Sequence, residues 1–368
     1  MPKVILISQF PMPYHGIGSW TTLYGNYLES NHHCIDAILC KKPQSMYPHI
    51  EYIYASTAIM SKIIKKMRKN SQHEYIESLL SYLEPNQKYI IQIIDNFGFA
   101  KALYDYVLEK PELKGSIYIQ FFYHGYPPFY GNFESRWFFE FIDEMVLLTY
   151  ASYCEHKRAY TNLPCLFSIL HNGIDTSKFF KVSSERKQEL KTKYNVSNKT
   201  IFLWCSQDRP KKGLDLILNV WNLLIRKYQH IELWVIGAER EINIDHVRFL
   251  GKIPNAKLPE YYQTSDCYVF PTLGHEGFGL TLIEALHCGN YCIASDLGGV
   301  AEVLQNGKLG VLIENPHFEN EWVEAMSAYL ELEVPHKYDM PNDCYTIDGW
   351  IEDMNRIIHS AKNRMLNT

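Results

Sequence analysis

The sequence predicts two α/β domains, each with a parallel β-sheet covered by helices. The chain has 368 residues, which is long enough for two such domains rather than one. Short apolar runs typical of buried parallel strands recur along it. Several of these runs lead through a glycine-bearing loop into a segment whose apolar residues have helical spacing. This alternation of strand, loop and helix is typical of doubly wound domains.

The composition narrows the possible classes of function. Hydrophobic residues make up 46% of the chain, which supports sizeable cores, and the net charge of −5 gives no overall attraction to nucleic acid. The nine cysteines are scattered and form no Cys-x-x-Cys pair, so we expect free thiols in a reducing compartment. Neither a signal peptide nor an apolar run of about 18 residues is found. We therefore expect a cytoplasmic protein that meets a membrane only from its surface.

The first expected strand is the apolar run Val4–Ile7. The loop after it carries Gly16 and Gly18, and a helix is expected to follow from Trp20. A glycine-bearing loop between a first strand and a first helix lets the backbone approach a ligand closely, although Gly-x-Gly alone is usually just a turn.

Two further apolar runs, Tyr89–Ile94 and Ser116–Phe122, predict buried strands. The second leads to His124, which precedes a loop rich in glycine, proline and aromatic residues. A histidine at the carboxyl end of a strand lies where α/β sheets bind ligands. A core histidine is the alternative interpretation.

Before these two strands, residues 59–70 form a basic amphipathic segment with no acidic residue. Ile59, Ile63, Ile64 and Met67 share one face of the predicted helix. Two interpretations remain open: a solvated helix lying on its domain, or an electrostatic contact with anionic lipid. The cations that would make this contact are Lys62, Lys65, Lys66, Arg68 and Lys69.

The second half of the chain repeats the alternation of strand and helix. The strand Thr200–Trp204 is followed by a loop that contains Lys211, Lys212 and Gly213, and a helix is expected from Leu214. Lysines at such a helix start suit the binding of an anion, whereas a surface charge run is the alternative. Later strands are expected at Ile231–Ile236, Cys267–Phe270 and Tyr291–Ala294.

The run Gly277-Phe278-Gly279 is interpreted as a turn from the strand Cys267–Phe270 into a helix over Leu280–Cys288. Gly289 suits the position just past the end of this helix. Free backbone N–H groups and the helix dipole at such a turn offer a seat for a phosphate.

Two glutamates flank this turn. Glu276 precedes the helix and Glu284 lies within it, and the helical rise over the interval is roughly 12 Å. That distance is close to the span of a ribose, a diphosphate and one hexose. One carboxylate can therefore accept hydrogen bonds from ribose hydroxyls and the other from sugar hydroxyls. As an isolated pattern, the pair could equally be a loop carboxylate and a solvated helix residue.

The pattern Glu276-Gly-Phe-Gly-Leu280-x-x-x-Glu284, followed by Ser295-Asp-x-Gly-Gly-x-x-Glu302, resembles the donor-site signature of glycosyltransferase family 4. Members of this family are retaining enzymes of the GT-B fold that use nucleotide sugars. The resemblance is specific over about residues 200–313 and weaker over the rest. It implies two Rossmann-like, doubly wound domains that face a cleft.

The resemblance also assigns roles to residues. The amides of Gly277, Phe278, Gly279 and Leu280 would hold the donor diphosphate together with Lys212. Glu284 would hold the ribose and Glu276 the donor sugar, while His124 and the loop with Gly16 and Gly18 would complete the site. The family has an arginine where this chain has Gln207, and Arg209 is the expected substitute.

The resemblance further implies three segments: an acceptor-binding domain over 1–180, a nucleotide-sugar-binding domain over 181–345, and a C-terminal helix over 346–368 that crosses back to the first domain. The expected function is retaining transfer of a hexosyl group from a nucleotide-diphosphate sugar to a glycan or lipid-linked saccharide, in surface polysaccharide or glycoconjugate synthesis. No metal or other cofactor is expected, because cationic side chains and a helix N-terminus can replace Mg²⁺. The alternatives are a non-catalytic nucleotide-sugar-binding subunit and another GT-B enzyme such as an epimerase.

Overall fold

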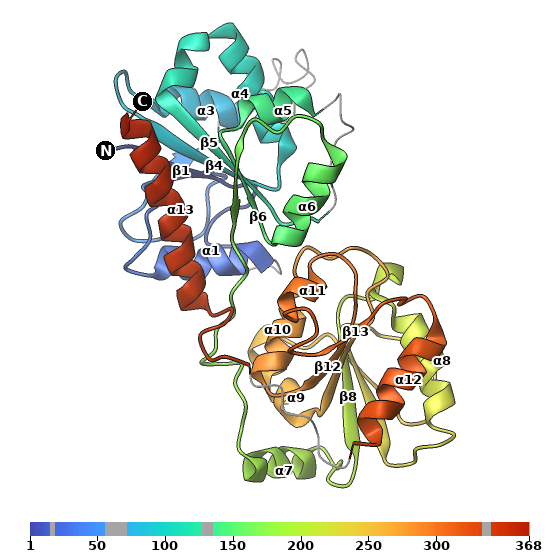
Figure 1. Ribbon diagram of the computed structural model, residues 1–368. Helices are drawn as coiled ribbons and strands as arrows, with labels where there is room; N and C mark the ends of the chain where they lie inside the picture. The colour runs from blue at the N-terminus through green and yellow to red at the C-terminus, as the bar shows by residue number, and fades with distance from the viewer. Residues whose placement is uncertain (15–18, 56–71, 127, 129–134, 333–339, 368) are drawn as a thin grey trace. The chain divides into compact units, whose positions relative to one another are not determined.

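The computed structural model describes residues 1–14, 19–55, 72–126, 128, 135–332 and 340–367. The chain divides into two compact units (Figure 1): Met1–His171 with Asp348–Thr368 form the first, and Asn172–Ile347 form the second. Each unit contains its own twisted parallel sheet and its own helices, as the sequence predicts.

The sheet of the first unit has seven strands in the order β3-β2-β1-β4-β5-β6-β7, all paired in parallel. The central strands are buried throughout, apart from Lys3 at the start of β1, which explains their continuous apolar sequences. The strands are β1 (Lys3–Ile7), β2 (Ala37–Cys40), β3 (Glu51–Tyr54), β4 (Tyr89–Ile94), β5 (Ile117–Tyr123), β6 (Glu144–Leu147) and β7 (Leu166–Ile169).

The helices described in the first unit connect these strands or cover them. They are α1 (Ser19–Glu29), α3 (His73–Tyr82), α4 (Phe97–Glu109), α5 (Arg136–Phe141), α6 (Tyr150–Ala159) and the C-terminal α13 (Ile347–Asn367), with a 3₁₀ turn at η1 (Pro111–Ser116). The basic segment with Lys62, Lys65, Lys66, Arg68 and Lys69 lies outside the described residues, as do Gly16 and Gly18.

Helix α13 belongs to the first unit although its sequence follows the second (Figure 1). Its buried stripe includes Trp350, whose ring packs edge-on against Tyr24 at 5.5 Å and Tyr27 at 5.7 Å between centroids. The Tyr27 hydroxyl also donates to Asn355 Oδ1 at 2.5 Å. The helix begins at Ile347, close to the start of the C-terminal helix expected over 346–368.

The sheet of the second unit has six parallel strands in the order β10-β9-β8-β11-β12-β13. They are β8 (Thr200–Cys205), β9 (Ile231–Ile236), β10 (Val247–Gly251), β11 (Cys267–Phe270), β12 (Tyr291–Ser295) and β13 (Val311–Ile313). Its helices are α7 (Ser184–Lys193), α8 (Leu214–Leu224), α9 (Leu258–Thr264), α10 (Leu280–His287), α11 (Val300–Val303) and α12 (Glu319–Leu330), with 3₁₀ turns η2 (Pro210–Lys212) and η3 (Asn255–Lys257).

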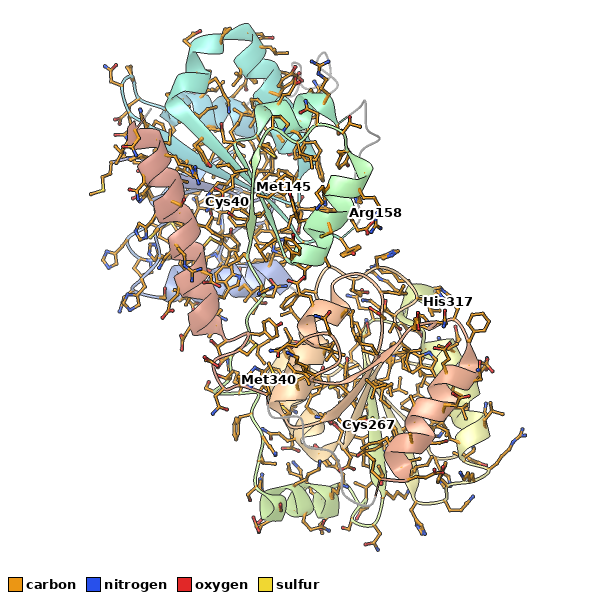
Figure 2. All side chains as sticks on the ribbon, viewed as in Figure 1. Cys40, Met145, Arg158, Cys267, His317 and Met340 are labelled. Atoms are coloured by element: carbon orange, nitrogen blue, oxygen red, sulfur yellow. The ribbon has the colours of Figure 1, made fainter. Side chains whose placement is uncertain are left out.

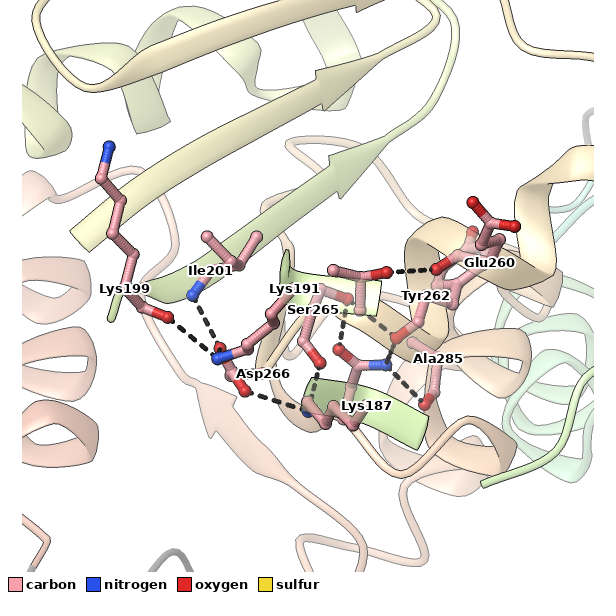
Figure 3. A network of polar contacts seen from close by, with 11 residues as sticks. Lys187, Lys191, Lys199, Ile201, Glu260, Tyr262, Ser265, Asp266 and Ala285 are labelled. Carbon is pink, nitrogen blue, oxygen red and sulfur yellow. Dashed lines mark hydrogen bonds and ion pairs between the residues drawn. The ribbon is translucent and has the colours of Figure 1, made fainter. Parts of the chain in front are cut away.

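A polar network ties α7 to the amino end of this sheet (Figure 3). The Asp266 carboxylate accepts a hydrogen bond from the Ile201 N–H at 2.8 Å and pairs with Lys191 at 2.7 Å and with Lys187 at 2.9 Å. Beside it, Asn290 Oδ1 accepts from Ser265 Oγ at 2.6 Å. The charged sequence before residue 194 is therefore a helix docked on the second unit.

The second unit begins at Asn172 rather than at residue 181, where the sequence interpretation placed the boundary. The physical reason is a pairing between the two connecting segments. Ile174 N–H donates to Tyr345 O at 2.9 Å, and Ile347 N–H donates to Ile174 O at 2.8 Å. Gly173 permits this approach, because a Cβ there would lie 2.3 Å from Thr346 O.

All nine cysteines are free, and six of them are buried. Cys40 and Cys267 lie in the sheets of the first and second unit (Figure 2), and neither has exposed surface. Burial raises the pKa of the Cys40 thiol above its usual range. These two side chains are packing residues of the strands.

Candidate functional site

Three loops meet at the carboxyl edge of the second sheet. Strands β8, β11 and β12 are neighbours and run parallel, so the loops that follow them emerge at the same edge. They are residues 206–213, 271–279 and 296–299. In open α/β sheets this edge is where ligands bind. These loops carry the residues that the sequence predicts for the donor site, apart from His124, Gly16, Gly18 and the helical residues Leu280 and Glu284.

The loop after β8 is fixed to the loop after β11 by backbone contacts. Leu273 N–H donates to Lys211 O at 2.8 Å. Gly213 has a φ of +69°, and a Cβ at this position would lie 1.9 Å from Pro271 O. Only glycine tolerates both the left-handed backbone and the close approach. The Lys211-Lys212-Gly213 sequence is thus a constrained turn and not a free surface charge run.

The loop after β12 fixes Glu276 in the same way. Gly298 has a φ of +78°, and a Cβ there would lie 2.4 Å from Glu276 O. Gly299 N–H donates to that same oxygen at 2.8 Å. The Gly-Gly pair of the sequence motif therefore holds the backbone of Glu276 in place.

Lys212 and Glu276 form an ion pair between these two fixed loops. The Lys212 Nζ lies 2.5 Å from Glu276 Oε1, and the two side chains are 19% and 15% exposed. Thr272 Oγ1 donates to the same carboxylate oxygen at 3.1 Å. The ammonium group also lies 5.9 Å from the Phe270 ring centroid. The structure thus brings together two residues that the sequence assigned to neighbouring parts of the donor.

Gly279 begins α10 with a φ of +100°. Leu282 and Ile283 donate their N–H groups back to Gly279 O. The amides that precede them point out of the helix end and are available to an anion. Phe278 contributes only backbone here, because its side chain is 2% exposed and packs edge-on against Tyr345.

Glu284 lies one turn into α10 and carries a buried, unpaired oxygen. Its Oε2 has no hydrogen-bond partner among the described residues, and neither does the buried hydroxyl of Tyr262. Burial raises the pKa of the Glu284 carboxyl to about 7, and the nearby Tyr262 hydroxyl opposes that shift. Buried polar atoms without partners are rare in folded proteins, and a carboxyl whose pKa is shifted by burial is a candidate for a functional site.

The structure shows a further cation at this edge that sequence reasoning missed. Arg240 follows β9, and its guanidinium donates to both carboxylate oxygens of Asp208 at 2.8 and 2.7 Å and also pairs with Asp215. This hydrogen bonding lowers the pKa of the Asp208 carboxyl. Arg240 therefore holds the loop in place, whereas Gln207 and Arg209 are exposed on it. Its position four residues after Ile236, the last residue of β9, is the signal that could have identified it.

In the first unit, His124 is held by a residue that the sequence interpretation also missed. His124 follows β5 and Asp95 follows the adjacent strand β4. The Asp95 carboxylate lies 2.9 Å from His124 Nδ1 and accepts the His124 N–H at 2.7 Å. The His124 side chain is 16% exposed, so it is not a core histidine.

Metal ligands do not gather in the described part of the chain. No group of three or more His, Cys, Asp or Glu side chains there could hold a metal ion. Within the same residues, no helix is both long and apolar enough to cross a membrane.

Comparison with solved structures shows which fold the chain has. The structure is similar over 99% of this chain to sucrose-phosphate synthase of Thermosynechococcus elongatus, with a TM-score of 0.73 and 15% identity over all of that chain. It is also similar to Anabaena HepE, solved in complex with UDP and glucose, with a TM-score of 0.70 and 14% identity over 98% of this chain and 100% of that one. The fold is therefore GT-B, with two Rossmann-like domains. Residues 186–345 match the family model described as glycosyl transferases group 1.

Curated relatives match about two fifths of the chain. The phosphatidyl-myo-inositol mannosyltransferase of Mycolicibacterium smegmatis is 29% identical over 150 residues, which are 39% of this chain and 37% of that protein. The GDP-mannose-dependent alpha-(1-6)-phosphatidylinositol monomannoside mannosyltransferase of the same organism is 24% identical over 159 residues, 39% of this chain and 41% of that protein. The chain thus matches about two fifths of the length of these relatives. Together the similarities support a glycosyltransferase.

Proposed function

We propose that this chain is a retaining glycosyltransferase that moves a hexosyl group from a nucleotide-diphosphate sugar to a glycan or lipid-linked saccharide. We place the reaction in surface polysaccharide or glycoconjugate synthesis. The observation that carries the proposal is the Lys212–Glu276 ion pair beside the glycine-capped start of α10, with Glu284 on the same helix. The names of the mannosyltransferase relatives and the complex of HepE with UDP and glucose support this choice.

In the proposed mechanism the bound donor separates Lys212 from Glu276 and gives each of them a new partner. The diphosphate accepts hydrogen bonds from the amides of residues 277–280 and takes Lys212 as its counter-ion. Glu276, which is released from Lys212, then accepts hydrogen bonds from hydroxyls of the donor sugar. Glu284 accepts hydrogen bonds from the ribose. Lys212 and the helix N-terminus offset the charge that develops on the leaving diphosphate. The proposed mechanism therefore requires no metal.

The bond changes follow a front-face displacement. The bond from the anomeric carbon to the diphosphate oxygen breaks, and a bond from that carbon to the acceptor oxygen forms on the same face. The acceptor proton passes to the departing phosphate oxygen, so the nucleoside diphosphate is the product and the anomeric configuration is retained. His124 is proposed to accept a hydrogen bond from a sugar hydroxyl.

A second candidate is a non-catalytic nucleotide-sugar-binding subunit of the same fold. The observation that favours it is Gln207 in place of the expected arginine, together with an exposed Arg209 on the same loop. Such a subunit would bind the donor but would not cleave it.

A panel of nucleotides distinguishes these candidates. Thermal shifts with UDP, GDP, ADP and CMP would identify the base, and incubation with the corresponding sugar nucleotides would report slow hydrolysis. The transferase predicts stabilisation by one nucleotide and release of that nucleotide from its sugar donor. Binding without hydrolysis or transfer would support the non-catalytic subunit, and no binding by any nucleotide would contradict both.

The peripheral membrane contact remains a proposal that depends on the basic segment at residues 59–70. Each cation near an anionic surface contributes about 1 kcal/mol at most, and salt screens this attraction. Co-sedimentation with anionic liposomes should therefore fall as the salt concentration rises. Replacement of Lys65, Lys66 and Lys69 by Glu should abolish it without affecting donor hydrolysis. A wild-type chain that ignores anionic liposomes at low salt would favour a soluble acceptor.

A further inference from the structure

The Asp95 carboxylate makes two separate contacts with His124. The two residues follow β4 and β5, which are neighbours in the middle of the first sheet. One carboxylate oxygen of Asp95 accepts the backbone N–H of His124 at 2.7 Å, and the other lies 2.9 Å from the ring Nδ1. Asp95 N–H in turn donates to Phe122 O at 2.9 Å. A single carboxylate thus fixes both the backbone and the ring of His124.

The backbone of Asp95 adopts an uncommon conformation to do this. Its φ is +51°, in the left-handed region that non-glycine residues seldom adopt. Glycine would adopt it without strain. Non-glycine residues in this region cluster at functional sites. What aspartate offers there, and glycine does not, is the carboxylate on His124.

The chain on the other side of His124 is equally constrained. A Cβ on Gly125 would lie 2.3 Å from the Cζ and Oη atoms of Tyr123, so the backbone folds directly over that ring. Tyr123 is 7% exposed and packs edge-on against His156 and Phe97. Since the backbone is held on both sides, the contact with Asp95 sets the rotation of the imidazole.

The same contact selects the tautomer. An ionised carboxylate only accepts hydrogen bonds, so the proton of the neutral ring resides on Nδ1. Nε2 then carries a lone pair, and it makes no hydrogen bond to any other residue that the structure describes. The partly exposed ring can thus accept a hydrogen bond from a hydroxyl group.

We propose that Asp95 is a positioning residue that holds His124 as the Nδ1–H tautomer, so that Nε2 accepts a hydrogen bond from a sugar hydroxyl. The assignment of the sugar rests on the proposed function, whereas the assignment of the tautomer does not. Asp95 acts through His124 and need not touch the substrate.

The substitution Asp95→Asn tests this with almost no change in shape. The amide oxygen of Asn must still accept the His124 N–H, because the amide nitrogen cannot. The NH₂ group then faces Nδ1 and can only donate to it. The ring proton must therefore move to Nε2, which loses its lone pair for the substrate. The change inverts the hydrogen-bonding character of His124 while both residues stay in contact.

The first readout is the ¹⁵N NMR spectrum of His124 in protein labelled at histidine nitrogens, recorded above neutral pH without substrate. Wild type should show Nδ1–H, and Asp95→Asn should show Nε2–H. The matched control is Asp143→Asn, because Asp143 also accepts a backbone N–H in this sheet, that of Ile119 at 2.8 Å, but at its amino end. This control should leave the His124 tautomer unchanged.

The second readout is turnover with the donor found by the nucleotide panel. Asp95→Asn should lower kcat roughly 10- to 100-fold with the donor KM within about twofold, while Asp143→Asn should change neither. A wild-type ring with Nε2–H, or an Asp95→Asn variant with the expected tautomer and unchanged kcat, would overturn the proposal. A chain with the predicted tautomers that cleaves no nucleotide sugar would instead refute the proposed function, and with it the sugar as the partner of Nε2.

Discussion

The two ends of the second sheet use charged residues in opposite ways. At the amino end, the Asp266 carboxylate accepts the Ile201 N–H and pairs with Lys187 and Lys191 (Figure 3). At the carboxyl end, Glu284 Oε2 is buried without a partner among the described residues, and so is Ser295 Oγ at the end of β12.

This difference separates scaffold from site. A polar network whose members are all paired makes a structure rigid, and removing one member leaves the others buried and unpaired. Buried groups without partners cost stability and persist where a ligand completes them. The carboxyl end also carries the Lys212–Glu276 pair, and we propose that a nucleotide sugar takes the place of each partner for the other. The comparison predicts that substitutions at one end change stability and at the other change binding and turnover.

The largest expected effect is on stability, at the amino end. Asp266→Ala should lower the free energy of unfolding by about 2–4 kcal/mol, because Lys191, Lys187 and the Ile201 N–H lose their shared acceptor. Urea denaturation measures this loss. A change below about 1 kcal/mol would show that the network does not hold the unit together.

Turnover should show the next largest effect, at the carboxyl end. Lys212→Ala and Glu276→Ala should each lower kcat/KM at least ~100-fold, about 2.7 kcal/mol, since each removes a charged contact near the reacting centre. Steady-state assays with the identified donor would measure it, and circular dichroism would confirm folding. The control is Lys227→Ala, which removes an exposed ion pair with Glu331 in the same unit. Activity of either variant within about threefold of wild type would contradict the assignment of Lys212 and Glu276 to the donor site.

How much of this site the sequence predicts depends on the distance along the chain between interacting residues. Local patterns predict the turn 277–279 and the helix after it. They also predict Gly289 beyond the end of that helix, where its φ is +83°. Gly298 was part of a recognised motif, but its contact with the backbone of Glu276 needs the order of β11 and β12.

The contacts that were missed are those between strand ends. Asp95 and His124 are 29 residues apart, and Arg240 is 32 residues from Asp208. Each pair meets only because the two strands are neighbours in a sheet, which residue periodicity does not reveal. The second unit begins at Asn172 and not at residue 181 for the same reason, because Ile174 pairs with Tyr345 and Ile347, which lie far along the chain.

A smaller effect concerns pH. Because burial raises the pKa of Glu284 to about 7, the carboxyl is largely protonated at pH 6 and ionised at pH 8. Ribose hydroxyls donate to the ionised form, so nucleotide affinity should rise by up to about tenfold over this range, with release of a proton on binding. Calorimetry in buffers of different ionisation enthalpy detects the proton. Glu284→Gln should abolish both the release and the pH dependence, and a wild-type chain that releases no proton near pH 6.5 would contradict this.

The raised pKa of Glu284 also makes the free energy of unfolding depend on pH. A carboxyl whose folded pKa is raised is favoured while protonated, so its contribution is full below its ordinary value of 4.5. That contribution is lost as the pH rises through about 7. The free energy of unfolding of wild type relative to Glu284→Gln should therefore fall between pH 4.5 and pH 7. An unchanged difference across this range would show that the carboxyl is not buried as described.

The smallest expected effect is that of a chelator. If Lys212 and the start of α10 carry the diphosphate charge, EDTA should leave turnover within about twofold of its value in untreated enzyme. Assays with and without added Mg²⁺ or Mn²⁺ measure this. Complete loss of activity that Mn²⁺ restores would place a divalent ion at the carboxyl end and change the comparison.

The most direct test of the central claim is nucleoside diphosphate binding, by calorimetry, to three folded proteins: wild type, Lys212→Ala and Asp266→Asn. The claim is that the carboxyl end of the second sheet binds the nucleotide while the amino end only supports the fold. It predicts one site in wild type, at least about tenfold weaker binding in Lys212→Ala, and wild-type affinity in Asp266→Asn despite its lower stability. Equal affinity in wild type and Lys212→Ala, or weakened binding only in Asp266→Asn, would contradict it.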